Sequence, residues 1–459
     1  MKPICMSLLA LAAMAAVPAR AQTDLVKEVQ ALRERLAEVE ARLHAATPQP
    51  GQWGMTPEQA REFSRLSLKA EALEDARDAS GLRQLRISGY ADPVLMLNRR
   101  QNRAGAQFLN PVGDDGYNYD NSYFGSAAID FQKETESGTR WRFTLVPNRS
   151  AGAVLDARSP VHEASLSMPL TDLQTRLIAG QIPDWTGYEY VQPQVNKLIT
   201  HNLLFDFTIP TAYTGAGLEL TRGKWIIKSV LGNVNATRKA PGQKTPTLSY
   251  RVDYAKGEFE GFGFTGSHGK YGNLADPSGR PTRFDLLEAD AYFIRGDLTL
   301  QGQLSWGRQR GAAIAPDPLS GALRDARWAG ISVLLAYKLS PRLELVARAD
   351  HLRNASNGGG LFGFTGYWDP ANGRLGDGRN GIGVDGRAGC LVDATLPACS
   401  RGANRSALSL GASYQLDLNT SLRFEYRLDH ADVASFVDTR DMSWHRGNQV
   451  LGGSVVVSF

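Results

Sequence analysis

The sequence predicts an all-β transmembrane barrel of about 16 antiparallel strands, preceded by a short helical coiled-coil extension. Three observations predict this fold. From Leu85 onward, apolar and polar residues alternate in segments of about ten residues, which is the length of a tilted membrane strand. Short and long connectors separate these segments. Beyond the N-terminal leader, no stretch approaches the roughly 18 consecutive apolar residues that a membrane-spanning helix needs.

The overall composition excludes several other classes of protein. The 51 Lys and Arg residues nearly balance the 47 Asp and Glu residues, which leaves a formal charge of only +4. A nucleic-acid partner is therefore not expected. Apolar residues make up 42% of the chain and charged residues 21%, which argues against wholesale disorder.

Residues 1–21 have the pattern of a secretory signal peptide. Lys2 provides the positive start, residues 4–17 form a short apolar run, and residues 19–21 match the small-x-small cleavage pattern. We expect cleavage before Gln22. A membrane anchor is the alternative, but the run is short for a hydrocarbon layer about 30 Å thick.

Residues 22–46 predict a coiled-coil oligomerisation segment. Glu28 and Arg33, and likewise Arg35 and Glu40, would face each other across a parallel interface with opposite charges. The same stretch resembles the signature of short trimeric coiled coils, which implies a homotrimer. A single amphipathic helix lying on another element is the alternative. The apolar seam comprises Leu25, Val29, Leu32, Leu36, Val39 and Leu43.

A linker and a second helix should follow the coiled coil. Residues 47–56 contain prolines and glycines and read as a linker. Thr56, Pro57 and Gln59 then form the start signal of a helix over residues 57–80, which we place at the periplasmic base of the barrel.

Residues 85–459 form the predicted barrel. In segment 420–430, for example, apolar residues fall on one face and charged residues on the other. The sixteen expected strands are 85–98, 121–133, 139–149, 161–170, 173–182, 212–222, 224–235, 248–256, 258–269, 284–294, 298–309, 327–338, 341–352, 405–416, 420–430 and 447–459. The long connectors are expected at 99–120, 183–211, 310–326 and 353–404, all on one side of the membrane.

Two parts of the barrel sequence resemble known outer-membrane proteins. The alternating C-terminus that ends in Phe459 resembles the signal by which Gram-negative barrel proteins are recognised for insertion. Residues 87–92 open the first strand in the manner of Gram-negative porins. Residues 179–183, 202–205 and 208–216 resemble the OmpL-like putative β-barrel porin family. The resemblance implies a porin in the bacterial outer membrane, in contact with its lipid.

A barrel of sixteen strands leaves an aqueous lumen, which suits the passage of small hydrophilic solutes. Charged side chains on the inward face would set the ion preference. Arg140, Arg142 and Arg176 have few acidic neighbours in sequence and are the best candidates for a basic wall patch. The alternative is that such residues pair along the wall as structural ladders. The expected pore-lining residues are Arg140, Arg142, Arg176, Arg251, Arg342, Arg348, Arg423, Arg427, Glu344 and Glu425.

The connector 183–211 is too long and too apolar to extend freely into water. In trimeric porins of sixteen strands the third long loop folds into the lumen, so we expect this connector to constrict the pore. Asp184, Glu189 and Asp206 could then face the basic wall. Packing over the barrel mouth or on a neighbouring subunit is the alternative.

The remaining chemistry of the chain is sparse. Cys390 and Cys399 are nine residues apart in a glycine-rich stretch of an exported chain, so we expect a disulfide rather than a metal site. No cofactor is expected. No histidine lies in a hydrolase or zinc motif, so an enzyme is not expected either. The competing function is a structural tether or assembly barrel, whose periplasmic extension binds the cell wall or a partner.

Overall fold

A computed structural model describes most of the barrel and one helix of the extension. The described residues are 35, 56–79, 81, 84–109, 125–147, 159–239, 243–272, 280–313, 316–317, 319–357, 368–369, 374–375, 382–390 and 396–459. Contacts divide the chain into two units, with the boundary between Leu85 and Arg86. The signal peptide, the linker up to residue 55 and the seam Val29, Leu32, Leu36, Val39 and Leu43 lie outside the described residues and stay predictions.

The described part of the extension is one helix, α3 (Pro57–Ala79). Its start is a capping box: the Thr56 backbone N–H donates to Gln59 Oε1 at 2.9 Å, and the Gln59 N–H donates to Thr56 Oγ1 at 3.2 Å. Gly81, with φ of +71°, lies two residues after its end. Several large apolar side chains of α3 are exposed, among them Phe63 and Leu66.

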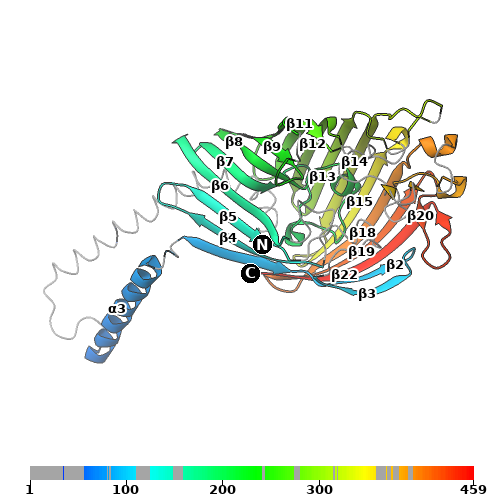
Figure 1. The fold of residues 1–459 in the computed structure, drawn as a ribbon. Coiled ribbons are helices and arrows are strands. Elements are labelled where there is room, and N and C mark those ends of the chain that lie inside the picture. The colour runs from blue at the N-terminus through cyan, green and yellow to red at the C-terminus, as the bar shows by residue number, and fades with distance from the viewer. Residues whose placement is uncertain are drawn as a thin grey trace. The chain divides into compact units, whose positions relative to one another are not determined.

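The second unit is a closed antiparallel barrel (Figure 1). Its strands are β1 (Leu85–Ala91), β2 (Val94–Asn98), β3 (Arg103–Gln107), β4 (Ala127–Glu134), β5 (Arg140–Leu145), β6 (Val161–Asp172), β7 (Thr175–Pro183), β8 (Ala212–Arg222), β9 (Trp225–Val234), β10 (Thr247–Ala255), β11 (Glu260–Tyr271), β12 (Thr282–Arg295), β13 (Leu298–Gln309), β14 (Ala326–Lys338), β15 (Leu343–Arg353), β18 (Arg405–Gln415), β19 (Thr420–Ala431) and β22 (Gly447–Ser458). Two small hairpins with strands of two residues each lie in connectors. One pairs β16 (Trp368–Asp369) with β17 (Arg374–Leu375), and the other pairs β20 (Phe436–Val437) with β21 (Trp444–His445).

These elements occupy sixteen strand positions, which confirms the predicted fold class. β1 and β2 are consecutive parts of the first position, and β3 and β4 are consecutive parts of the second. The barrel closes where β1 and β2 pair with β22, with Tyr90 opposite Ser458 and Val94 opposite Ser454.

The second strand position begins earlier than the sequence indicates. β3 pairs with β2 directly after a tight turn, so that Arg103 lies opposite Asn98. The expected long connector 99–120 therefore contains a strand. The reason is that β3 consists of Arg, Ala, Gly and Gln and lacks the large apolar residues that produce an alternating signal.

Seven short turns join strands at one end of the barrel, and the long connectors lie at the other end (Figure 1). Gly223 and Gly296 adopt φ of +58° in two of these turns, a conformation that glycine allows at little cost. Since both barrel termini lie at the short-turn end, all of the long connectors share the opposite side.

Alternation along each strand separates an apolar outer face from a polar inner face. In β13, Leu300, Leu304 and Trp306 are exposed on the outside, whereas Gln301 and Gln303 between them are buried inside. Within the described part of the chain, no helix is both long and apolar enough to cross a membrane.

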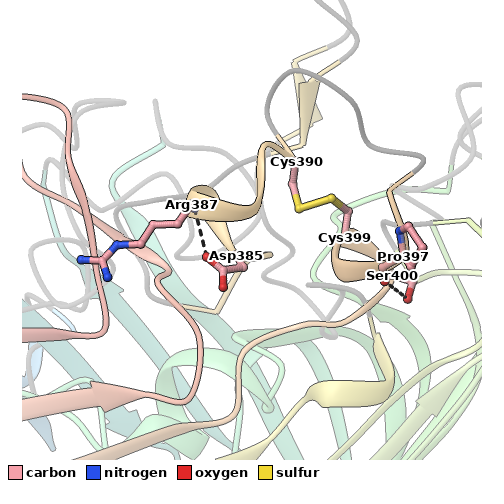
Figure 2. Close-up of a disulfide and its surroundings, with 6 residues drawn as sticks. All are labelled: Asp385, Arg387, Cys390, Pro397, Cys399 and Ser400. Atoms are coloured by element: carbon pink, nitrogen blue, oxygen red, sulfur yellow. Dashed lines mark hydrogen bonds between the residues drawn. A yellow bond between two sulfur atoms is a disulfide. The ribbon is translucent and has the colours of Figure 1, made fainter.

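A disulfide braces the longest connector. The Cα atoms of Cys390 and Cys399 lie 5.4 Å apart and their sulfurs are bonded (Figure 2). The same segment is tied to the connector before β22, because the Arg387 guanidinium donates to the Trp444 carbonyl at 2.7 Å and the Gly386 N–H donates to the Ala434 carbonyl at 2.9 Å. These two hydrogen bonds join the two connectors at this end of the barrel.

Candidate channel and its constriction

The connector between β7 and β8, residues 184–211, lies against the inner wall of the barrel. It contains a short 3-10 helix, η2 (Pro193–Val195), and a five-residue helix, α4 (Leu203–Phe207). Asn202 caps α4, since its Oδ1 accepts from the Leu204 N–H at 2.9 Å and the Phe205 N–H at 2.8 Å. The apolar side chains of α4 explain why the segment avoids water. Leu203, Leu204 and Phe207 are buried in a cluster with Phe284, Trp328 and Leu352 of the wall.

Arg348 of β15 is the central anchor of the connector. Its guanidinium donates to Glu189 Oε1 at 2.8 Å and to the carbonyls of Thr200 and His201 at 2.7 and 2.9 Å. Asp350 lies 3.2 Å away on the same strand. The side chains of Arg348 and Glu189 are 0% and 4% exposed, so this pair is shielded from water and holds two distant parts of the connector at once.

Two residues of β19 hold the same stretch of connector. Glu425 accepts from the Ile199 and Thr200 N–H groups at 2.8 and 2.7 Å, and from Thr200 Oγ1 at 2.6 Å. Arg427 donates to the His201 carbonyl at 2.7 Å. Because the carboxylate binds N–H groups and the guanidinium binds a carbonyl, backbone polarity matches the wall charge along this segment.

Further contacts extend this attachment in both directions. Lys197 Nζ lies 2.7 Å from Glu344 of β15, and Arg423 of β19 donates to the Pro193 carbonyl at 2.5 Å. At the start of the connector, Arg251 of β10 donates to the Trp185 carbonyl at 2.7 Å and pairs with Asp290 at 2.8 Å. The connector is thus bound to the wall from β10 to β19.

The carboxylates of the connector are themselves engaged. Asp184 accepts from Tyr213 and from the Thr186 N–H, and burial raises its pKa to about 6. Burial also raises the pKa of Asp206 to about 7, against the opposing influence of Arg427 and Arg405. Asp184, Glu189 and Asp206 therefore lie against the wall and its partners, rather than at a free edge facing water.

A different set of charges lies on the wall formed by β4, β5 and β6. Arg142 Nε lies 2.9 Å from Asp130 and 3.4 Å from Glu163. Further round, Lys228 of β9 pairs with Glu219 of β8 at 3.4 Å. The Arg142 side chain is 23% exposed, whereas that of Arg348 is fully buried under the connector. The wall of β4 to β6 is therefore in contact with solvent at Arg142.

A family model described as "Protein of unknown function (DUF3138)" matches residues 54–459. The chain belongs to this family. Its description differs from that of the OmpL-like porin family, so the finer resemblance of residues 179–216 stays a prediction. None of the curated proteins matches the chain.

Solved structures show the fold of this DUF3138 member. OmpF of Salmonella typhi, in complex with daunomycin, has 12% identity and a TM-score of 0.51, over 82% of this chain and 97% of that one. OmpT of Vibrio cholerae has 9% identity and a TM-score of 0.49, over 82% and 97%. An anion-selective porin from Comamonas acidovorans has 10% identity and a TM-score of 0.48, over 82% and 99%. The OmpF likeness shows that the fold is that of a porin barrel.

The other expected pore-lining residues have different surroundings. Arg140 pairs with Glu134 at 3.2 Å and is partly exposed. Arg176 is buried and donates to Ser167 Oγ at 2.7 Å. Arg342 is exposed in the turn before β15, because the strand begins only at Leu343 and the inward alternation starts after it.

Sequence reasoning missed several residues of this site. Asp130 and Lys197 were not singled out, although Asp130 alternates with the outward Ile129 and could have been placed inside. Arg405 was also missed. It is fully buried, its guanidinium lies 5.2 Å from the ring centres of both Phe207 and Phe436, and it donates to Asp429 at 2.8 Å. Such contacts between distant segments leave no trace in local periodicity.

Proposed function

We propose that this protein is an outer-membrane porin, which forms a water-filled channel for the passive diffusion of small hydrophilic solutes. The observation that carries the proposal is the connector 184–211, which is folded inside a sixteen-strand barrel. It would narrow the lumen, while the Arg142 side chain on the opposite wall stays partly exposed to solvent. The extension would lie in the periplasm and the long connectors outside the cell.

The water path would run between the connector and the wall of β4 to β6. Val191 and Gln192 are among the less buried connector residues and would form one side. Arg142 and Arg140 would form the other. In this proposal the buried residues Arg251, Arg348, Arg423, Arg427 and Glu425, together with the half-buried Glu344, hold the constriction in place rather than touching the permeating solute.

Conductance in a planar bilayer tests the porin proposal. We expect the refolded, full-length protein to produce stable steps in salt solution, because water-filled sixteen-stranded barrels conduct ions. A folded barrel without conductance would contradict the proposal. That result would favour the tether, for which the exposed apolar residues Phe63 and Leu66 of α3 offer a contact site.

A homotrimer is the proposed assembly. An open apolar depression lies on the outer surface of β4 to β7, and it is lined by aromatic and small residues, including Phe131, Trp141, Phe143, Ala164 and Ala179. An exposed apolar surface of three aromatic side chains beside two alanines suits close packing against a second barrel. Together with the predicted seam at 22–46, this surface supports self-association.

The seam can be tested with matched variants. Replacing Leu32 and Leu36 with Asn should lower the temperature at which the oligomer dissociates on heated gels, because both residues occupy the predicted apolar interface. The control replaces Ala31 and Ala37, which lie outside the seam, with Asn. If both variants dissociate at the wild-type temperature, the extension does not hold the oligomer together.

A further inference from the structure

Five basic side chains form a row on the outer face of the barrel, near the ends of β11 to β15 that lead into the long connectors. The basic row comprises Lys270, Arg283, Arg308, Arg327 and Arg353. Their outward direction follows from the alternation of the strands. Arg283 precedes the buried Phe284, and Arg327 precedes the buried Trp328. The side chains of Arg283 and Arg327 are 61% and 58% exposed.

The register of the sheet places like charges directly opposite each other in this row. Lys270 lies opposite Arg283 on the neighbouring strand, and Arg308 lies opposite Arg327. Such pairs destabilise a sheet, because their side chains are only about 5 Å apart. Between these two pairs the register places Asp285 opposite Arg308, so one carboxylate offsets part of the repulsion and the surface stays basic.

The nearby acidic residues compensate only part of this charge. Asp285 lies 3.2 Å from Arg283 and is also bound by His268 at 3.0 Å. Asp325 pairs with Arg308 and lies 3.7 Å from Arg327. Among the described residues, Lys270 and Arg353 have no ion pair. Three of the five cations thus pair with two carboxylates, and the other two cations add uncompensated charge.

The wall directly below the basic row is apolar and exposed. Leu287, Trp306 and Ile331 lie on the outer face of the same strands, two to four residues further toward the short-turn end. At about 3.3 Å per residue, this places apolar surface roughly 7 to 13 Å from the cations. A ligand with an anionic head and a hydrocarbon tail matches both parts, whereas a free anion would use only the first.

We propose that the basic row binds the phosphorylated headgroup of a membrane lipid, whose acyl chains lie along Leu287, Trp306 and Ile331. The inference rests on the proposed membrane location, but not on conduction. Phosphate suits the site because arginine side chains bind its oxygens through paired N–H groups. The row lies on β11 to β15, away from the depression on β4 to β7, so both surfaces could be occupied at once.

The test compares two triple variants of the full chain in detergent, with phosphatidic acid as the probe. We expect R283Q/R327Q/R353Q to bind roughly a hundredfold more weakly than the wild type, since each basic residue contributes about a fivefold factor at a lipid surface. The control, R222Q/R295Q/R342Q, removes three exposed charges at the short-turn end and should bind like the wild type. Binding is measured by native mass spectrometry.

Four further readouts distinguish a lipid site from a site for free anions and from a structural role of the basic row. Phosphatidylcholine with the same chains should bind weakly, and millimolar inorganic phosphate should not displace phosphatidic acid. The melting temperature of the lipid-free row variant should stay close to that of the wild type, because the lost repulsion and the lost surface pairs with Asp285 and Asp325 are both small effects. Its conductance should be unchanged. Equal loss of binding in both triple variants, or displacement by inorganic phosphate, would each overturn the proposal.

Discussion

Replacing Arg348 with methionine should free the connector 184–211 from the barrel wall and widen the channel. The change leaves Glu189, Asp350 and Glu425 without the cation that lies among them, in a region shielded from water. Removing one partner of a buried ion pair costs about 3–5 kcal/mol in the free energy of unfolding. Because the strand ladder is untouched, the cost should fall mainly on the connector rather than on closure of the barrel.

Single-channel conductance measures the outcome, and we expect it to at least double, with more frequent fluctuations. The matched control is Arg342→Met, because that residue is exposed in the turn before β15 and does not contact the connector through any described interaction. A second variant, Arg348→Met with Glu189→Gln, should recover part of the lost stability, since one of the stranded carboxylates is then neutral. Wild-type conductance in a folded Arg348→Met protein would show that the connector does not depend on this anchor.

The sequence predicted the barrel well because membrane strands carry a simple physical signal. In β19, Leu422, Phe424 and Tyr426 face outward and Arg423 and Glu425 face inward, and the periodicity alone fixes those directions. The signal weakens where the outward side chains are small. The sequence pattern assigns β3 to a connector because its outward residues, Ala104 and Ala106, are too small to mark an apolar face.

The contacts of the connector were harder to predict than its position. Its apolar content indicated that it would leave water, and α4 indeed packs against the wall. Which charge it would meet depends on the fold of the whole barrel. Glu189 and Arg348 are 159 residues apart, and their pairing follows from the path of the connector rather than from any local pattern. For the same reason, inward alternation could not distinguish the buried Arg348 from the partly exposed Arg142.

Replacing Arg142 with glutamate should shift the channel strongly toward cations. The wild-type guanidinium lies between Asp130 and Glu163, and the substitution places three carboxylates together on the wall that borders the proposed water path. The local charge changes by two units. In water, two unit charges 4 Å apart interact with an energy of about 1 kcal/mol. Even after screening by salt, the ratio of cation to anion permeability should therefore rise severalfold. The reversal potential across a salt gradient measures this ratio.

Arg342→Glu is the control for this shift, because it makes the same change of charge in an exposed turn. We expect its reversal potential to stay near that of the wild type. Arg142→Gln changes the charge by one unit without adding a carboxylate, so it should give an intermediate value and guards against a failure of the glutamate variant to fold. The shift should also grow as the salt concentration falls, since the Debye length lengthens from about 10 Å at 0.1 M to 30 Å at 0.01 M. A conducting Arg142→Glu channel with the wild-type reversal potential would place the water path away from β4, β5 and β6.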